Sequence, residues 1–175
     1  MPARLLILSG DRPDLFAQIA EQHGIDGAEY LVHRAERDAV PGWLSAADAG
    51  IAFIRTATCE RGSSPVKIGE YLAVGLPVVI TNSIGNYSDL IARENIGAVI
   101  SAHTSESYLK AAHRLVSLWR DKETLRDQCR SIAQSELGLE SVGHLRYETV
   151  YNQLLGADAL RSAAATNAVH YKLDE

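Results

Sequence analysis

The sequence is poor in the features that define several protein classes. Its 175 residues include only two cysteines, Cys59 and Cys129, which stand in unrelated surroundings. Two such cysteines make no disulfide framework and favour a reducing compartment, so we expect a cytoplasmic protein. The aliphatic run at residues 5–8 is too short for a signal-peptide core. No run approaches the length of a membrane-spanning helix, so we expect no membrane span.

An excess of positive charge is also missing. Lysine and arginine total 17, aspartate and glutamate total 22, and the formal net charge is −5. Nucleic-acid-binding proteins usually carry a basic surface, so we expect no nucleic-acid partner. The hydrophobic share of 46% and the charged share of 22% are those of an ordinary folded domain and argue against disorder. A chain of this length buries enough surface to fold without a disulfide or metal staple.

Several nucleotide-binding and signalling motifs are absent. No two of the 13 glycines are two residues apart, so the Gly-x-Gly-x-x-Gly loop of dinucleotide-binding enzymes is missing. No glycine precedes a lysine, which excludes the phosphate-binding loop of P-loop NTPases. A phospho-receiver domain needs an aspartate after the third strand, where Ile54 and Arg55 stand. The six histidines lack metal-ligand spacing, so we expect no metal ion and no cofactor.

Short apolar runs alternate with helical patterns over the first hundred residues. The five runs are residues 5–8, 28–32, 49–54, 77–80 and 98–100. Helical patterns lie between several of them. Runs that are apolar on both faces are typical of parallel strands covered by helices on both sides. We therefore expect an α/β fold with a Rossmann-like, doubly wound parallel sheet of about five strands.

The rest of the chain has a helical pattern. Leu109, Ala112, Val116 and Trp119 recur at helical spacing and predict the core-facing side of one helix. Asp121 is a suitable N-cap for the next helix. A third helical pattern follows, and we expect one domain over residues 1–155. Residues 156–175 are rich in alanine and have no periodicity, so we expect a C-terminal tail.

The most informative segment is RGSSPVKIGEYLAVGLPVV, at residues 61–79. We interpret it as a loop, a short helix and a buried strand. Ser64 is a candidate helix cap, Pro65 suits the first turn, and Gly75 suits the left-handed residue that ends a helix. The free N–H groups and the dipole at such a helix start attract an anion such as a diphosphate.

Side chains near this helix start have the chemistry to hold a nucleotide. Gly62, Ser63 and Ser64 would let the backbone approach the phosphates closely. Lys67 adds a positive charge one turn in, and Glu70, three residues later, lies on the same helix face. A carboxylate accepts hydrogen bonds only and can take both hydroxyls of a ribose. The alternative is an ordinary capped helix with a weak Lys67–Glu70 surface pair, and both interpretations stay open here.

The same segment resembles the signature of family 4 glycosyltransferases of GT-B fold. The resemblance rests on SSPVKIGEYLA at residues 63–73, followed by GLPVV at 75–79. Flanking segments agree with the family: LSAADAG at 44–50, the glycine-containing loop at 84–86, and NIGAVI at 95–100. It extends over about residues 5–155. It implies the C-terminal, nucleotide-sugar-binding domain of such an enzyme.

The resemblance implies roles for individual residues. Glu70 matches the glutamate that binds the donor ribose, and Ser63, Ser64 and Lys67 are the candidates for the diphosphate. The first glutamate of the family's Glu-x7-Glu motif falls at Gly62 here, and we expect the loop backbone to take over its contact with the donor sugar. The other candidates for the donor-nucleotide site lie after predicted strands: Arg55, His33, Arg34, Gly85 and Asn86. For the histidine and the two arginines, the alternative is a solvated turn.

The expected function is donor binding in a retaining glycosyltransferase, which transfers a sugar from a nucleotide diphosphate to an acceptor hydroxyl in glycan or polysaccharide synthesis. Family members also have an acceptor-binding N-terminal domain. We therefore expect such a domain or subunit as a partner, and an isolated chain without activity. The alternative is a stand-alone, non-catalytic module that binds a nucleotide sugar or a protein. The domain would begin at its second strand, and we expect the uncovered edge or face to form a homodimer.

Overall fold

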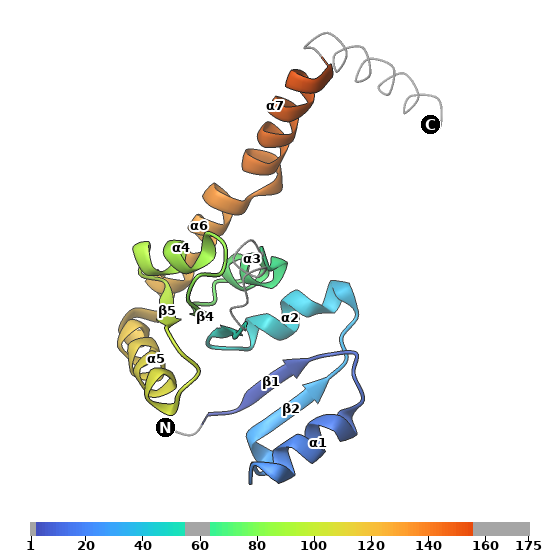
Figure 1. Ribbon diagram of the computed structural model, residues 1–175, viewed down its shortest axis with the longest axis vertical. Helices are drawn as coiled ribbons and strands as arrows, with labels where there is room; N and C mark the ends of the chain where they lie inside the picture. The colour runs from blue at the N-terminus through green and yellow to red at the C-terminus, as the bar shows by residue number, and fades with distance from the viewer. Residues whose placement is uncertain (1–2, 55–63, 156–175) are drawn as a thin grey trace. The chain divides into compact units, whose positions relative to one another are not determined.

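Five short strands alternate with helices in the computed structural model, which describes residues 3–54 and 64–155 (Figure 1). The chain divides into two compact units, residues 1–130 and 131–175. The elements are, in order, β1 (Leu5–Leu8), α1 (Pro13–Gln22), β2 (Tyr30–His33), α2 (Val40–Ser45), β3 (Gly50–Ala52), α3 (Val66–Ala73), β4 (Val78–Thr81), α4 (Tyr87–Arg93), β5 (Gly97–Ile100), α5 (Ser105–Leu118), α6 (Lys122–Leu137) and α7 (His144–Leu155).

All strand pairs are parallel, which confirms the α/β prediction. Strand β1 pairs with β2 in a two-stranded sheet, and β3, β4 and β5 pair in that order in a three-stranded sheet. The strands cover the five predicted apolar runs, with ends that differ by one or two residues. Within the described residues, neither β1 nor β2 pairs with β3, β4 or β5. The five strands therefore form two separate sheets.

The core of the first unit is built around β4. Its four residues, Val78, Val79, Ile80 and Thr81, are all buried. One face of the three-stranded sheet packs against α5, in a buried cluster made of Val79, Ala98, Ile100, Ala111 and Leu115. Each fully buried valine, isoleucine or leucine side chain contributes about 1.5–3 kcal/mol relative to an exposed one. An apolar central strand covered on both faces is what the sequence pattern predicted.

Two glycines stand beside Val78 in the same row across this sheet. Gly50 on β3 and Gly97 on β5 are both its register partners. A Cβ atom on Gly50 would overlap the Tyr71 ring of α3, and one on Gly97 would overlap the Val78 carbonyl and approach Ile91 of α4. Helices α3 and α4 therefore lie directly against the sheet backbone on the face opposite α5.

Helix α3 ends where the sequence predicted. Gly75 has a φ of 84° and its N–H donates to the Leu72 carbonyl over 2.9 Å. The N–H of Leu76 donates to the Tyr71 carbonyl over 2.8 Å. These two bonds form a Schellman motif, which returns the chain into β4 after a single left-handed residue.

Asp121 confirms the predicted N-cap of α6. Its Oδ1 accepts the Thr124 N–H over 3.1 Å. Hydrogen bonds from Thr124 lower the pKa of the Asp121 carboxyl. Further along the same helix, Cys129 is a free, buried cysteine, and burial raises the pKa of its thiol to about 11. A thiol in that state is unreactive at neutral pH. Cys59 lies outside the described residues.

The predicted core face of α5 is wrong. The buried residues of this helix are Ala111 and Leu115, whereas Leu109 is 58% exposed and Val116 is 53% exposed. The helix carries two adjacent apolar stripes, and helical periodicity alone does not say which one faces the sheet. Trp119 alone among the four predicted residues packs partly against the core cluster. The second stripe, with Leu109, Ala112 and Val116, stays on the surface.

Helix α4 was not predicted as a helix. It is only seven residues long and follows a loop that contains Gly85. Leu90 and Ile91 are buried, Asp89 lies in the first turn and Arg93 in the last, which suits the helix dipole. This charge placement was the signal available in the sequence.

The close packing of α3 on β3 is testable. We expect Gly50→Ala to lower the free energy of unfolding by about 1–3 kcal/mol, because the added methyl group overlaps the Tyr71 ring. The measurement is urea unfolding followed by circular dichroism. Gly42→Ala is the control, since a Cβ there meets nothing within 4 Å. In a Tyr71→Ala background the loss should shrink, and an unchanged loss would show that the ring is not its cause.

Candidate functional site

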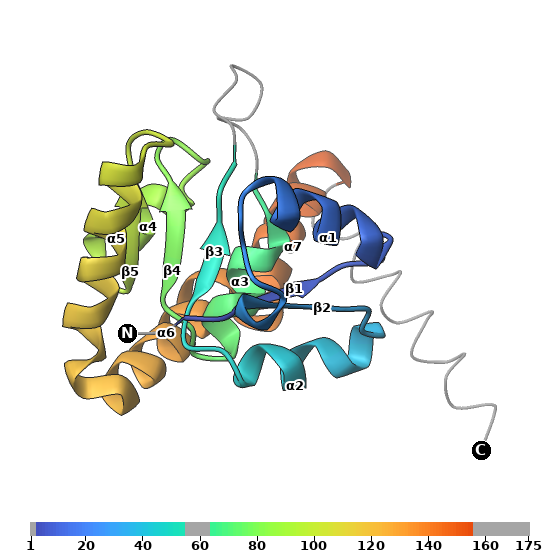
Figure 2. The same ribbon diagram turned by 90° about the horizontal axis from the view of Figure 1, so that it is seen from below.

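The start of α3 lies at the carboxyl edge of the three-stranded sheet. The last residues of α3 bond into the turn that leads into β4, as shown by Leu76 and Tyr71. The helix therefore runs back against the strand direction, and its first turn lies where the strands end (Figure 2). Ligands of open α/β sheets bind at this edge. The predicted position of the donor site relative to the sheet is thus geometrically possible.

The helix start differs from the prediction in one respect. Pro65, and not Ser64, is the N-cap residue, and no side-chain cap bond forms among the described residues of this helix start. Ser64 is exposed and stands one position too early, because Pro65 has extended backbone angles and the helix begins at Val66. The Pro65 carbonyl accepts the Ile68 N–H over 3.2 Å. Because a proline side chain has no hydrogen-bonding group, the N-cap residue gives the amides of the first turn no side-chain partner, and such amides suit an external acceptor.

Lys67 and Glu70 are both exposed on α3. They form no ion pair with each other, although both residues lie in the described part of the chain. The surface pair that was the alternative interpretation is therefore not seen. The roles predicted for these two residues stay predictions.

Tyr71 fixes this helix against β3. Its ring occupies the space beside Gly50, where a Cβ atom would otherwise lie. Burial raises the pKa of the Tyr71 phenol, and the neighbouring Glu70 carboxylate raises it further. The phenol is thus neutral at physiological pH. Because Tyr71 is adjacent to Glu70 in the helix, its packing also fixes the backbone that carries this carboxylate.

The end of β3 is held by a residue that sequence reasoning missed. The Ile54 N–H donates to Oγ1 of Thr81, which is buried at the end of β4, over 3.0 Å. This bond ties the chain just after β3 to the end of β4. The predicted site residues Arg55, Gly62 and Ser63 lie outside the described residues. A buried threonine at a strand end, next to three aliphatic residues, was the signal in the sequence.

The loop after β4 lies at the same edge. Ser83 has a φ of 62° and Gly85 a φ of 48°, and both values lie in the left-handed region. Asn86 is exposed and is the N-cap residue of α4, with its carbonyl accepting the Leu90 N–H over 3.0 Å. The structure thus places Gly85 and Asn86 after β4 at the edge where α3 begins, and their contact with a donor stays a prediction.

His33 and Arg34 lie at the end of β2, in the other sheet and just after it. His33 ends β2, and its ring lies 4.1 Å from the Trp43 ring, centroid to centroid. Its carbonyl accepts the Ser9 N–H over 3.1 Å. Arg34 is exposed. The stacking with Trp43 gives His33 a packing role in the described structure, and a role in donor binding stays a prediction.

The structure also contains an aromatic cluster that the sequence did not predict. The Phe53 ring, just after β3, lies 5.1 Å from the Tyr108 ring, and Nδ1 of His103 lies 3.0 Å from the Tyr108 hydroxyl. Phe53 is 42% exposed and Tyr108 38% exposed. Phe53 is about 50 residues from the other two, so no local pattern brings it to them. They form a partly exposed aromatic surface beside the end of β3.

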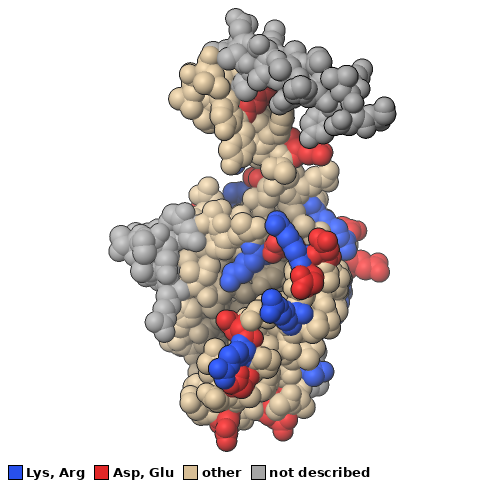
Figure 3. Space-filling model, turned by 90° about the vertical axis from the view of Figure 1, so that its right-hand side faces the viewer, with Lys and Arg blue, Asp and Glu red and all other residues tan. Residues whose placement is uncertain are grey.

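The molecular surface has mixed charge on the face shown in Figure 3, where basic and acidic side chains lie intermingled. The described residues hold no cluster of three or more histidine, cysteine, aspartate or glutamate side chains arranged to bind a metal ion. In that same part of the chain no helix is both long and apolar enough to cross a membrane.

The fold and the segment around α3 define a class of protein. Residues 2–118 match the family described as glycosyl transferases group 1, and the chain belongs to this family. This confirms the resemblance to family 4 glycosyltransferases of GT-B fold. No curated protein matches the sequence significantly.

Among solved structures, the chain is similar to WaaG, a glycosyltransferase involved in lipopolysaccharide biosynthesis. The TM-score is 0.60 at 21% sequence identity, and the match covers 77% of this chain. At that identity the likeness shows the fold. The match covers 35% of the WaaG chain, so this chain spans about a third of its structural relative.

Proposed function

We propose that this chain is the donor-binding half of a retaining glycosyltransferase that takes a sugar from a nucleotide diphosphate to an acceptor hydroxyl in glycan or polysaccharide synthesis. The observation that carries the proposal is the uncapped start of α3. The chain belongs to the group 1 glycosyltransferases. In its structure this helix start lies at the carboxyl edge of a parallel sheet, and Lys67 and Glu70 are exposed on the first two turns. Backbone amides at a helix start, an exposed lysine and an exposed carboxylate suit a diphosphate followed by a ribose.

The chemistry proposed for this edge is stabilisation of the leaving group. When the bond between the sugar and the diphosphate breaks, negative charge grows on the diphosphate oxygens. Backbone amides at the start of α3 and the Lys67 ammonium group would stabilise this charge, since fixed donors need no reorganisation during the reaction. Glu70 would accept hydrogen bonds from the ribose hydroxyls and set the position of the nucleotide. The nucleotide sugar is the substrate, and no resident cofactor is part of the proposal.

A partner half that binds the acceptor is part of the same proposal. The chain spans about a third of WaaG, and several apolar residues of the first unit lie exposed. Leu5 on β1 is 47% exposed, Ile51 on β3 is 42% exposed, and the outer stripe of α5 adds Leu109 and Val116. Strands of parallel sheets are normally buried on both faces, so this exposure suits a surface that another domain or subunit covers.

Glu70 provides the direct test of donor binding. We expect Glu70→Gln to weaken nucleoside diphosphate binding at least about tenfold, equivalent to roughly 1.4 kcal/mol, because the amide loses the charge and one acceptor. Isothermal titration calorimetry against the common nucleoside diphosphates measures this. Glu123→Gln, an exposed carboxylate on α6, is the matched control. The loss should be smaller for a 2′,3′-dideoxy analogue, and equal losses for both ligands would mean that Glu70 acts structurally.

The isolated chain should bind without catalysing. We expect the purified protein to show no sugar transfer and no donor hydrolysis above background, because the acceptor half is absent from the reaction. Released nucleoside diphosphate is measured by mass spectrometry over a panel of nucleotide sugars. If the wild-type chain transfers sugar and the Glu70→Gln variant does not, the expectation is wrong and the chain contains a complete active site. The same assay with an acceptor half added separates the enzyme from the non-catalytic binding module.

The exposed stripe of α5 should also drive self-association when the partner half is absent. We expect a homodimer in size-exclusion chromatography with light scattering, because Leu109 and Val116 expose aliphatic surface on one side of a helix. Val116→Glu should give a monomer. His113→Glu, an exposed position on the same helix, should leave the dimer intact. A wild-type chain that stays monomeric at high concentration would refute this expectation.

A further inference from the structure

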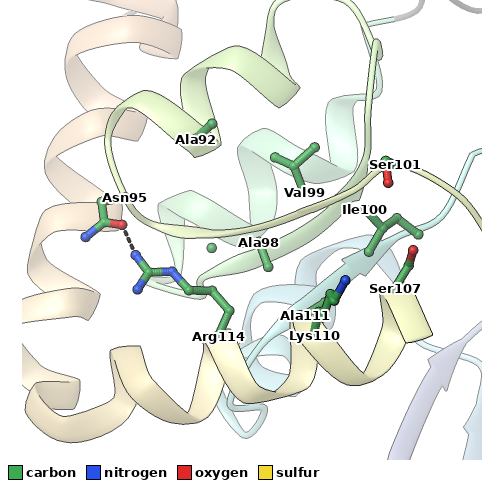
Figure 4. Close-up of a pocket in the computed structure, with 11 residues that line it drawn as sticks. Ala92, Asn95, Ala98, Val99, Ile100, Ser101, Ser107, Lys110, Ala111 and Arg114 are labelled. Carbon is green, nitrogen blue, oxygen red and sulfur yellow. Dashed lines mark hydrogen bonds between the residues drawn. The ribbon is translucent and has the colours of Figure 1, made fainter. Parts of the chain in front are cut away.

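A groove runs along the outer edge of β5, between α4 and α5 (Figure 4). It has a volume of about 450 Å³. Its floor is β5 and the residue after it, Ser101, and small residues line both walls, Ala92 on the side of α4 and Ala111 on the side of α5. The groove lies along the free edge of the outermost strand, β5. The start of α3 lies elsewhere, because α3 connects β3 to β4.

The strand presents unpaired backbone groups to this groove. The carbonyls of Ile96 and Ile100 accept N–H groups from Val78 and Asn82, so these residues point toward β4. Backbone direction alternates along a strand, and the N–H and C=O groups of Gly97, which is buried, and of Val99, which is half-buried, therefore point away from β4. In the described residues β5 pairs only with β4. An edge of this kind is a template for one more strand.

Two cations line the same groove, one turn apart on α5. The guanidinium group of Arg114 donates to the side-chain oxygen of Asn95 and to Oγ of Ser117, both neutral groups, and no ion pair of Arg114 is seen among the described residues. Lys110 forms an ion pair of 2.6 Å with Glu106, and both side chains are 76% exposed. Exposed pairs of this kind are weak, so the lysine is available to a second carboxylate. The groove thus combines an unpaired strand edge with net positive charge.

We propose that this groove binds an extended peptide segment of a partner protein, which adds a strand to β5 and carries acidic residues at alternate positions. Lys110 and Arg114 are separated by one helical turn, a rise of about 6 Å. Side chains on one face of a strand repeat every two residues, at about 6.6 Å. Two acidic side chains two residues apart would therefore meet the two cations. The residue between them would face α4, where Ala92 leaves room for an apolar side chain.

A defined peptide tests the proposal on the full chain. The probe is fluorescein-labelled Ser-Glu-Val-Glu-Val-Glu-Val-Ser-Gly, and binding is measured by fluorescence anisotropy. We expect saturable binding, and at least about tenfold weaker binding when lysine replaces the glutamates. Two further probes carry N-methyl groups on one or the other set of alternate residues. One set of N–H groups faces β5 and the other faces solvent, so one of these probes should fail and the other should bind.

Matched variants of the protein separate backbone from charge. Val99→Pro removes an outward N–H while the bonds to β4 stay, and proline is tolerated at strand edges. It should abolish binding, whereas Val99→Ala should retain it. The double variant Lys110→Gln with Arg114→Gln should weaken binding at least about tenfold. The control variant Arg12→Gln, which changes an exposed arginine just before α1, should not weaken binding. Circular dichroism and thermal melting confirm that each variant is folded.

Three outcomes would overturn the proposal. The first is an absence of binding up to about 1 mM probe, in which case Lys110 simply protects an edge strand from association. The second is equal binding of both N-methylated probes, which would rule out strand addition. The third is unchanged binding by the Val99→Pro variant.

Discussion

The burial of β4 is the constraint on which the rest of the first unit depends. Its four residues are inaccessible to solvent because β3 and β5 flank it and helices cover both its faces. Its parallel pairing aligns the ends of three strands at one edge. The start of α3, the loop with Gly85 and the bond between Ile54 and Thr81 all meet that edge. The candidate site is therefore a consequence of how one aliphatic strand is buried.

Local patterns were sufficient for much of this fold. Runs of aliphatic residues predicted the five strands, because a strand covered on both faces has no polar face to obscure the pattern. Gly75 and Asp121 were predictable since each ends or begins a helix by a bond within a few residues of itself. The family signature at residues 63–79 then indicated the class of protein, which the match over residues 2–118 confirms.

Features that depend on distant contacts were not predictable in this way. The apolar residues of α5 form two stripes, and only contact with the sheet selects Ala111 and Leu115 for burial. The division into two sheets depends on which strand edges meet, and no residue pattern within a strand specifies its neighbours. Within the site, Ser64 is a residue type that can cap a helix. The N-cap residue is nevertheless Pro65, because its backbone is extended and the helix begins only at Val66. Thr81 acts on a chain segment 27 residues away.

Gly50, which stands in one row with Val78 and Gly97, lets α3 pack closely against the sheet. The ring of Tyr71, near the last turn of this helix, rests directly on the backbone of Gly50 at the amino end of β3. The first turn, with Lys67, lies at the other end of the helix. A side chain at position 50 would push this ring away from the sheet and change how closely α3 packs against β3. The packing of the helix whose first turn is the candidate site thus depends on the absence of one methyl group at the opposite edge of the sheet.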